Sequence, residues 1–158
     1  MRANIATLPQ DSLSQLRQIP AWAWFGGWVY VVLLINSSLL LSDSDTYWQT
    51  ATGQWILDHG ALPHSDIYSF TKSGDYWISS SWLAQVAFAG AYRILGWTGP
   101  LSLAAAAAAG TFAWLTSILC RRLPAAYAIL IAFVALLVSV THLFVRPHVL
   151  ALPVMLAW

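Results

Sequence analysis

Four long runs without a charged residue do most to limit what this chain can fold into. They contain no Asp, Glu, Lys or Arg, and they cover residues 18–42, 94–120, 123–145 and 147–158. A helix of about 20 mostly apolar residues crosses a bilayer core of about 30 Å, because it makes every backbone hydrogen bond internally. The runs therefore predict an all-α membrane protein.

The composition excludes several other classes of protein. Hydrophobic residues make up 59% of the 158-residue chain and charged residues only 8%, whereas an ordinary globular protein has about 25% charged residues. A soluble enzyme and a disordered tail are therefore excluded, and the net charge of +1 gives no basic surface for nucleic acid. The single cysteine, Cys120, permits no internal disulfide.

We expect a transmembrane helix bundle that packs through small residues, such as the alanines at 104–109. Residues 1–20 would form a cytoplasmic segment, and residues 21–158 the N-terminal part of a polytopic domain. The first apolar stretch is longer than the roughly 7–15 residues of a signal peptide, which favours an uncleaved anchor. The expected spans are 21–41, 101–120, 123–143 and an incomplete fourth at 149–158.

The topology depends on whether the stretch Trp82–Gly96 crosses the membrane. This is uncertain from composition, because the stretch is apolar but carries Gln85 and Arg93. At about 1.5 Å per residue it reaches only about 22 Å, which is too short to cross without strain. We therefore predict an interfacial helix and one extracytoplasmic loop over residues 43–98. The pair Arg121–Arg122 would then be a cytoplasmic turn; if Trp82–Gly96 spans instead, the pair lies outside.

The outer loop carries most of the polar chemistry of the chain, including five of its six acidic residues. Asp43–Ser44–Asp45 precedes a helical pattern over 46–57, and His59–Gly60 is a typical helix end. A turn is expected at 73–75, and Ser79–Ser80–Ser81 is expected to cap the interfacial helix. The loop is thus predicted to fold over the membrane surface with two juxtamembrane helices.

Asp43 and Asp45 have two possible roles, and their spacing alone does not separate them. One role is helix capping with a favourable interaction with the helix dipole, each contributing about 0.3–1 kcal/mol. The other is a general base or metal ligand at membrane level, where weak solvation raises the proton affinity of a carboxylate.

The order of these elements resembles the GT-C class of membrane glycosyltransferases, in particular the protein O-mannosyltransferase-like and aminoarabinose-transferase-like group. In that group an acidic motif follows the first span and opens a juxtamembrane helix with the pattern D-x-x-x-Y-x-x-x-A. Asp43, Tyr47 and Ala51 match it here, and Trp82–Leu83 and Arg146-Pro147-His148 resemble later elements. The Lys-Pro-Pro element of some members is missing beside Lys72.

The resemblance implies a role for each of these residues. Asp43 would be the base that activates the acceptor, and Asp45 a second carboxylate or a contact for a divalent metal. Tyr47, Arg146 and His148 would bind substrate, although Arg146 could instead reach to lipid headgroups. The donor would be a sugar on a polyprenyl phosphate, used on the outer side of a bacterial inner membrane and with no resident cofactor. The alternative is a non-enzymatic polytopic membrane protein, such as a transporter fragment or an assembly factor.

Overall fold

The computed structural model describes residues 19–158, which are helical over 71% of their length and form no strand. The predicted all-α class is therefore confirmed for this part of the chain. The expected cytoplasmic segment 1–20 lies outside the described residues, apart from its last two positions. The helices are α2 (Ala21–Ile35), α3 (Ser37–Leu40), α4 (Ser44–His59), α5 (Trp82–Leu95), α6 (Thr98–Leu119), α7 (Ala125–Ser139), the 3₁₀ helix η1 (Val140–His142) and α8 (Pro147–Ala157).

Two helical stretches are long and apolar enough to cross a membrane: α6, and α7 continued through η1 to His142. Helices α2 and α8 are apolar but shorter. The first expected span, 21–41, differs from the structure because it is not one continuous helix. Asn36 leaves helical geometry with φ −93° and ψ 34°, and its side-chain amide donates to Val32 O at 2.8 Å. An asparagine side chain competes in this way with the backbone bonds of a helix.

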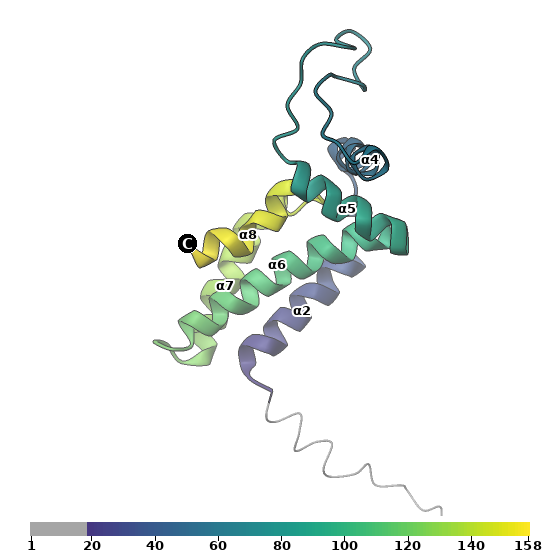
Figure 1. Cartoon of the computed structure of the whole chain (residues 1–158). Helices are drawn as coiled ribbons and strands as arrows, with labels where there is room; N and C mark the ends of the chain where they lie inside the picture. The colour runs from purple at the N-terminus through teal and green to yellow at the C-terminus, as the bar shows by residue number, and fades with distance from the viewer. Residues whose placement is uncertain (1–18) are drawn as a thin grey trace, which may run out of the picture.

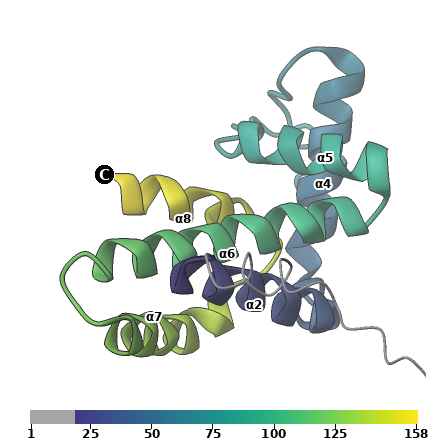
Figure 2. The same ribbon diagram turned by 90° about the horizontal axis from the view of Figure 1, so that it is seen from below.

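Helix α6 is the central element, and it contacts α2, α5, α7 and α8 (Figures 1 and 2). Small residues make this possible, since the alanines of α6 at 104, 105, 108 and 109 are buried. Gly26 of α2 lies so close to α6 that an added Cβ would stand 2.6 Å from the Cβ of Ala113. The expectation that this run packs through small residues is thus confirmed.

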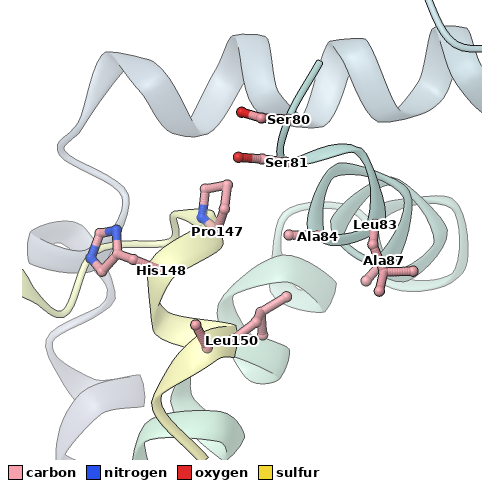
Figure 3. A pocket seen from close by; sticks show the side chains of 9 residues that line it. Ser80, Ser81, Leu83, Ala84, Ala87, Pro147, His148 and Leu150 are labelled. Carbon is pink, nitrogen blue, oxygen red and sulfur yellow. The ribbon is translucent and has the colours of Figure 1, made fainter. Parts of the chain in front are cut away.

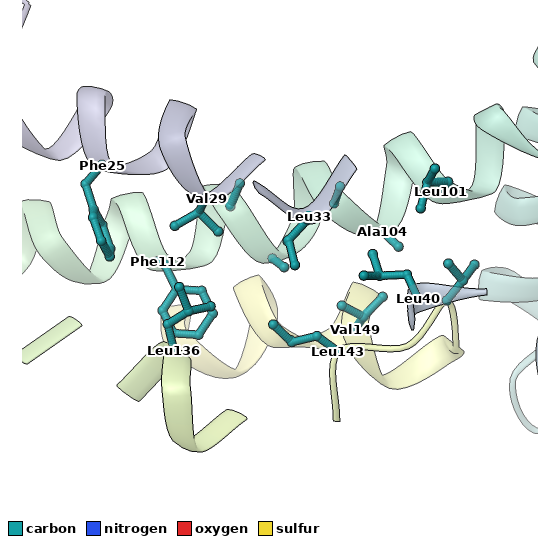
Figure 4. Packing of buried hydrophobic residues seen from close by; sticks show 14 of the residues in the cluster. Phe25, Val29, Leu33, Leu40, Leu101, Ala104, Phe112, Leu136, Leu143 and Val149 are labelled. Atoms are coloured by element: carbon teal, nitrogen blue, oxygen red, sulfur yellow. The ribbon is translucent and has the colours of Figure 1, made fainter. Parts of the chain in front are cut away.

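The core is a single apolar cluster between these helices (Figure 4). Helix α2 contributes one side of it, α6 runs through its middle, and α7 and α8 close the other side. Its larger members are Phe25, Val29, Leu33, Leu40, Phe88, Leu101, Phe112, Leu136, Leu143, Val145 and Val149.

Helices α4 and α5 pack on each other at the end of the molecule where α6 begins, and α5 lies between α4 and α6 (Figure 1). They approach closely at Gly53, where an added Cβ would lie 1.9 Å from the backbone oxygen of Gln85. Helix α4 ends at Gly60, which has φ 61° and confirms the expected glycine stop. Ser81 is the residue before α5, but its side chain makes no capping bond, so that expectation is wrong.

Ser79 does not cap α5 because its hydroxyl is used inside the contact between α4 and α5. It donates to Oε1 of Gln85 at 2.5 Å, and Nε2 of Gln85 donates to Oε1 of Gln49 on α4 at 2.6 Å. Gln85 is only 1% exposed. One of the two polar residues that made this stretch an uncertain span in the sequence therefore lies inside a helix contact.

The turn between α6 and α7 lies at the opposite end of the helices from α4 and α5 (Figure 1). Arg121 and Arg122 occupy this turn, and both are exposed. This is the relative placement expected for the outer loop and the arginine pair. Which end faces the outside of a cell stays a prediction.

Candidate functional site

The candidate site begins at the N-terminus of α4, where Asp43 is the N-cap residue. Oδ1 of Asp43 accepts a hydrogen bond of 3.0 Å from the backbone N–H of Asp45. An aspartate in this position accepts a hydrogen bond from an N–H that the helix itself leaves unpaired. Its negative charge also interacts favourably with the positive end of the helix dipole. The capping role expected for Asp43 is therefore present in the structure.

A segment from the other end of the chain docks against this helix start. The backbone N–H of Val145 donates to Leu40 O at 3.1 Å, and the hydroxyl of Thr46 donates to Val145 O at 3.0 Å. Thr46 and Val145 are both fully buried. These bonds place the next residue, Arg146, directly beside the two aspartates.

Arg146 forms ion pairs with both Asp43 and Asp45, and we call these three residues the Arg146 cluster. The same nitrogen, Nη2, contacts Oδ2 of Asp43 and, at 2.9 Å, Oδ2 of Asp45. The indole N–H of Trp48 donates to the other oxygen of Asp45 at 3.1 Å. Nε of Arg146 is buried and has no hydrogen-bond partner among the described residues. The guanidinium group therefore serves two carboxylates with one nitrogen and keeps another donor free.

This pairing sets the protonation of the cluster. The hydrogen bond from Arg146 lowers the pKa of Asp43 below its ordinary value of 3.8, and it outweighs the opposing effect of partial burial. The backbone N–H of Asp45 and the charges of Arg146 and His148 act in the same direction. Asp43 in turn raises the pKa of Arg146. The expectation of a raised proton affinity at Asp43 is therefore wrong for this arrangement, because a cation lies against the carboxylate.

The other two predicted binding residues are placed differently from each other. His148 lies in the first turn of α8, and its ring nitrogen Nε2 is 2.6 Å from His142 O. Tyr47 lies on α4, where its ring contacts Trp97 edge-on at 4.9 Å and its hydroxyl is 3.5 Å from Leu41 O. His148 thus accompanies the Arg146 cluster, whereas the contacts of Tyr47 are with other elements.

A cavity of about 540 Å³ opens beside His148, between the start of α5 and the first turns of α8. Figure 3 shows the hydroxyls of Ser80 and Ser81 with Pro147 and His148 around one part of it. The rest of the wall is apolar and consists of Leu83, Ala84, Ala87, Leu150 and Ala151. The cavity therefore combines an apolar groove with a few polar groups, which is the usual construction of a small-molecule site.

The Arg146 cluster does not fit a divalent metal ion as it stands. The positive charge between the two carboxylates already belongs to Arg146. No group of three or more His, Cys, Asp or Glu side chains converges anywhere within residues 19–158. A metal held by Asp43 and Asp45 would have to displace the guanidinium first.

Two members of the site were not recognised in the sequence. Trp48 follows Asp45 by three residues on a helix, and this spacing could have predicted the hydrogen bond from its indole to the Asp45 carboxylate. No local pattern marks the bond from Thr46 to Val145, because it joins distant parts of the chain.

Comparisons of the chain with protein-family models, curated proteins and solved structures gave no significant match.

Proposed function

We propose that the chain belongs to a membrane glycosyltransferase that takes a sugar from a polyprenyl-phosphate donor and transfers it to an extracytoplasmic acceptor. The observation that carries the proposal is the buried Nε of Arg146, a charged donor without an acceptor among the described residues. Arg146 directly precedes Pro147 and His148, which stand in the wall of the apolar groove. The oxygens of a phosphate group match the donor fork of an arginine, as those of a carboxylate do. The groove beside it suits the hydrocarbon tail of the same molecule.

The outer surface of the helices supports a membrane setting and a bundle of spans. On α7 and its extension, only 17% of the spanning window is buried inside the protein. Leu130, Val134, Leu137 and Val138 are each more than half exposed. An apolar face of this kind is stable in lipid but costly in water. Charged groups lie beyond the helix ends, at Arg121–Arg122 and in the Arg146 cluster.

The Arg146 cluster suggests how donor binding could prepare the reaction. An arriving phosphate competes with the two aspartates for the guanidinium group of Arg146. When Asp43 loses that partner, its pKa rises toward the ordinary value and the carboxylate becomes a better proton acceptor. The acceptor hydroxyl then attacks the anomeric carbon of the donor sugar and passes its proton to Asp43. The bond from that carbon to the phosphate oxygen breaks, and polyprenyl phosphate leaves with the electron pair.

The test compares two lipids that share a tail but differ in charge. The chain in nanodiscs should bind polyprenyl phosphate about tenfold more tightly than the uncharged polyprenol. Arg146→Gln should remove this preference, while the control Arg122→Gln at the opposite end should keep it. In the full-length protein, Asp43→Asn should lower sugar transfer by about 10²-fold or more without loss of folding. Equal binding of the two lipids by the wild-type chain contradicts the proposal.

A second candidate function is favoured by the full pairing of the two carboxylates in the cluster. Asp43 and Asp45 each have one oxygen on Arg146, and their other oxygens accept from Asp45 N–H and Trp48. These bonds alone would make the cluster a latch between α4 and α8 in a non-enzymatic membrane protein. In that case Asp43→Asn lowers stability and expression, and no phosphate preference is found.

A further inference from the structure

A second cavity, separate from the groove beside His148, lies between α4 and the segment that connects α4 to α5. Its volume is about 330 Å³, and its walls are Trp48, Asp66, Tyr68, Ser69 and Trp77. This is near the lower end of the roughly 300–1,000 Å³ of small-molecule sites. It has room for one small ring-shaped ligand.

The connecting segment is held in place by its own hydrogen bonds. Asp66 N–H donates to Asp75 O at 2.8 Å, and Trp77 N–H donates to His64 O at 3.0 Å. Gly74 has φ 87° and lies at the turn between these two paired stretches of backbone. The paired backbone carries Asp66 and Trp77 to the same cavity.

Two indole rings form the apolar part of this cavity. Trp48 and Trp77 stand edge to face, with ring centroids 6.1 Å apart and an interplanar angle of 64°. In that arrangement one ring presents its face toward the edge of the other, and both indoles line the cavity. The ligand should therefore have an apolar face.

The polar part of the cavity is an anionic acceptor. Oδ1 of Asp66 accepts from the backbone N–H groups of Tyr68 and Ser69, both at 2.9 Å. A hydrogen bond from the Ser69 side chain, helped by these backbone bonds, lowers the pKa of Asp66, so the carboxylate is ionised at neutral pH. It favours ligands that donate hydrogen bonds and disfavours anions. A ligand with one apolar face and a rim of hydroxyl donors is a neutral pyranose sugar.

We propose that the cavity between Trp48, Asp66 and Trp77 binds a neutral pyranose ring, with an indole against the sugar face and the carboxylate on its hydroxyls. Trp48 connects this site to the Arg146 cluster, since its N–H bonds Asp45. A sugar in the cavity thus lies one indole away from Asp45, the carboxylate that shares Arg146 with the candidate base Asp43. We infer that this sugar is the acceptor of the transfer reaction, and that step rests on the proposed function, whereas sugar binding itself does not.

The test measures binding of methyl glycosides of glucose, mannose, galactose and N-acetylglucosamine. The chain is placed in nanodiscs, because sugar-based detergents would compete for the same cavity. Saturation-transfer NMR should detect binding of at least one of them with a Kd of about 1–10 mM. Methyl glucuronide should bind more weakly than its neutral counterpart, and Asp66→Asn should reduce that difference.

Variants separate the cavity from other aromatic surfaces. Trp77→Ala should weaken binding about tenfold, and Trp77→Phe, which keeps a ring for packing, should retain most of it. The matched control is Trp55→Ala, because Trp55 is also on α4 but stacks on His59 at 4.1 Å. An equal loss in Trp55→Ala and Trp77→Ala overturns the inference.

The inference and the proposed function can fail separately. If no methyl glycoside binds up to about 50 mM while the preference for polyprenyl phosphate is present, only the sugar site is wrong. If a glycoside binds in a Trp77-dependent manner but the phosphate preference is missing, the sugar site stands and the transferase proposal falls.

Discussion

The hydroxyl of Thr46 donates a hydrogen bond of 3.0 Å to the backbone oxygen of Val145, a residue 99 positions later in the chain. Both residues are completely buried. This bond fixes the start of α4 to the segment before α8 and brings Arg146 to the aspartates. The site therefore exists only when distant parts of the chain are folded together.

We predict that Thr46→Val destabilises the protein by about 1–3 kcal/mol, because Val145 O is left buried without its donor. Thr50→Val is the matched control on the same helix. The Thr50 hydroxyl bonds only to Thr46 O one turn back, so its loss should cost less. Unfolding of the reconstituted chain by denaturant measures both values. Equal losses in the two variants would show that the bond from Thr46 to Val145 contributes no more to stability than a bond within the helix.

The stability of the Arg146 cluster should depend on acid pH in one direction. Because the folded-state pKa of Asp43 is below its ordinary value of 3.8, its contribution is present above that value. It is lost as the pH falls through the lower folded value. The wild-type chain should therefore be more stable than Asp43→Asn at neutral pH, and the difference should shrink as the pH falls below the ordinary value of 3.8. Denaturation midpoints of both proteins across this range provide the measurement. A difference that is independent of pH contradicts the pairing.

Gly53→Ala should separate α4 from α5. The new methyl group would lie 1.9 Å from Gln85 O and 2.8 Å from the Ala89 Cβ, so the helices must move apart. We expect a loss of about 1–3 kcal/mol or more. Gly90→Ala, on the open side of α5, should be neutral or stabilising by up to about 1 kcal/mol. The two variants are compared by thermal unfolding; a neutral Gly53→Ala would mean that the helices are further apart in solution.

The sidedness of the chain can be tested by cysteine labelling. With Cys120→Ser as background, Ser73→Cys and Arg122→Cys each place a single exposed thiol at one end of the molecule. A membrane-impermeant maleimide should label position 73 in intact cells and position 122 only after permeabilisation. Labelling of position 122 from outside would reverse the topology and make Trp82–Gly96 a true span.

Local signals were sufficient to predict most helix positions. The N-cap at Asp43 and the glycine stop at Gly60 bound α4, because capping chemistry acts over one or two turns. The break at Asn36 was missed, since one polar residue in an apolar run is a weak signal against the long run around it.

The candidate site was predicted only in part, for a physical reason. Asp43, Asp45 and Arg146 were singled out separately, but their ion pairs join segments about 100 residues apart. Periodicity and capping rules contain no information on such a contact. The pKa direction of Asp43 followed from that missing contact and was therefore predicted with the wrong sign.

The same long-range contact has a consequence for the order in which the protein is made. The start of α4 is synthesised long before Arg146, since Thr46 and its partner Val145 are 99 positions apart. At about 5–20 residues per second, the ribosome needs about 5–20 s to cover that interval. During this time the aspartates at the start of α4 carry their charge without the arginine that later neutralises it. A nascent chain stalled before residue 146 should therefore be open at this point to proteolysis and to quality-control factors, and it should close only when α8 emerges.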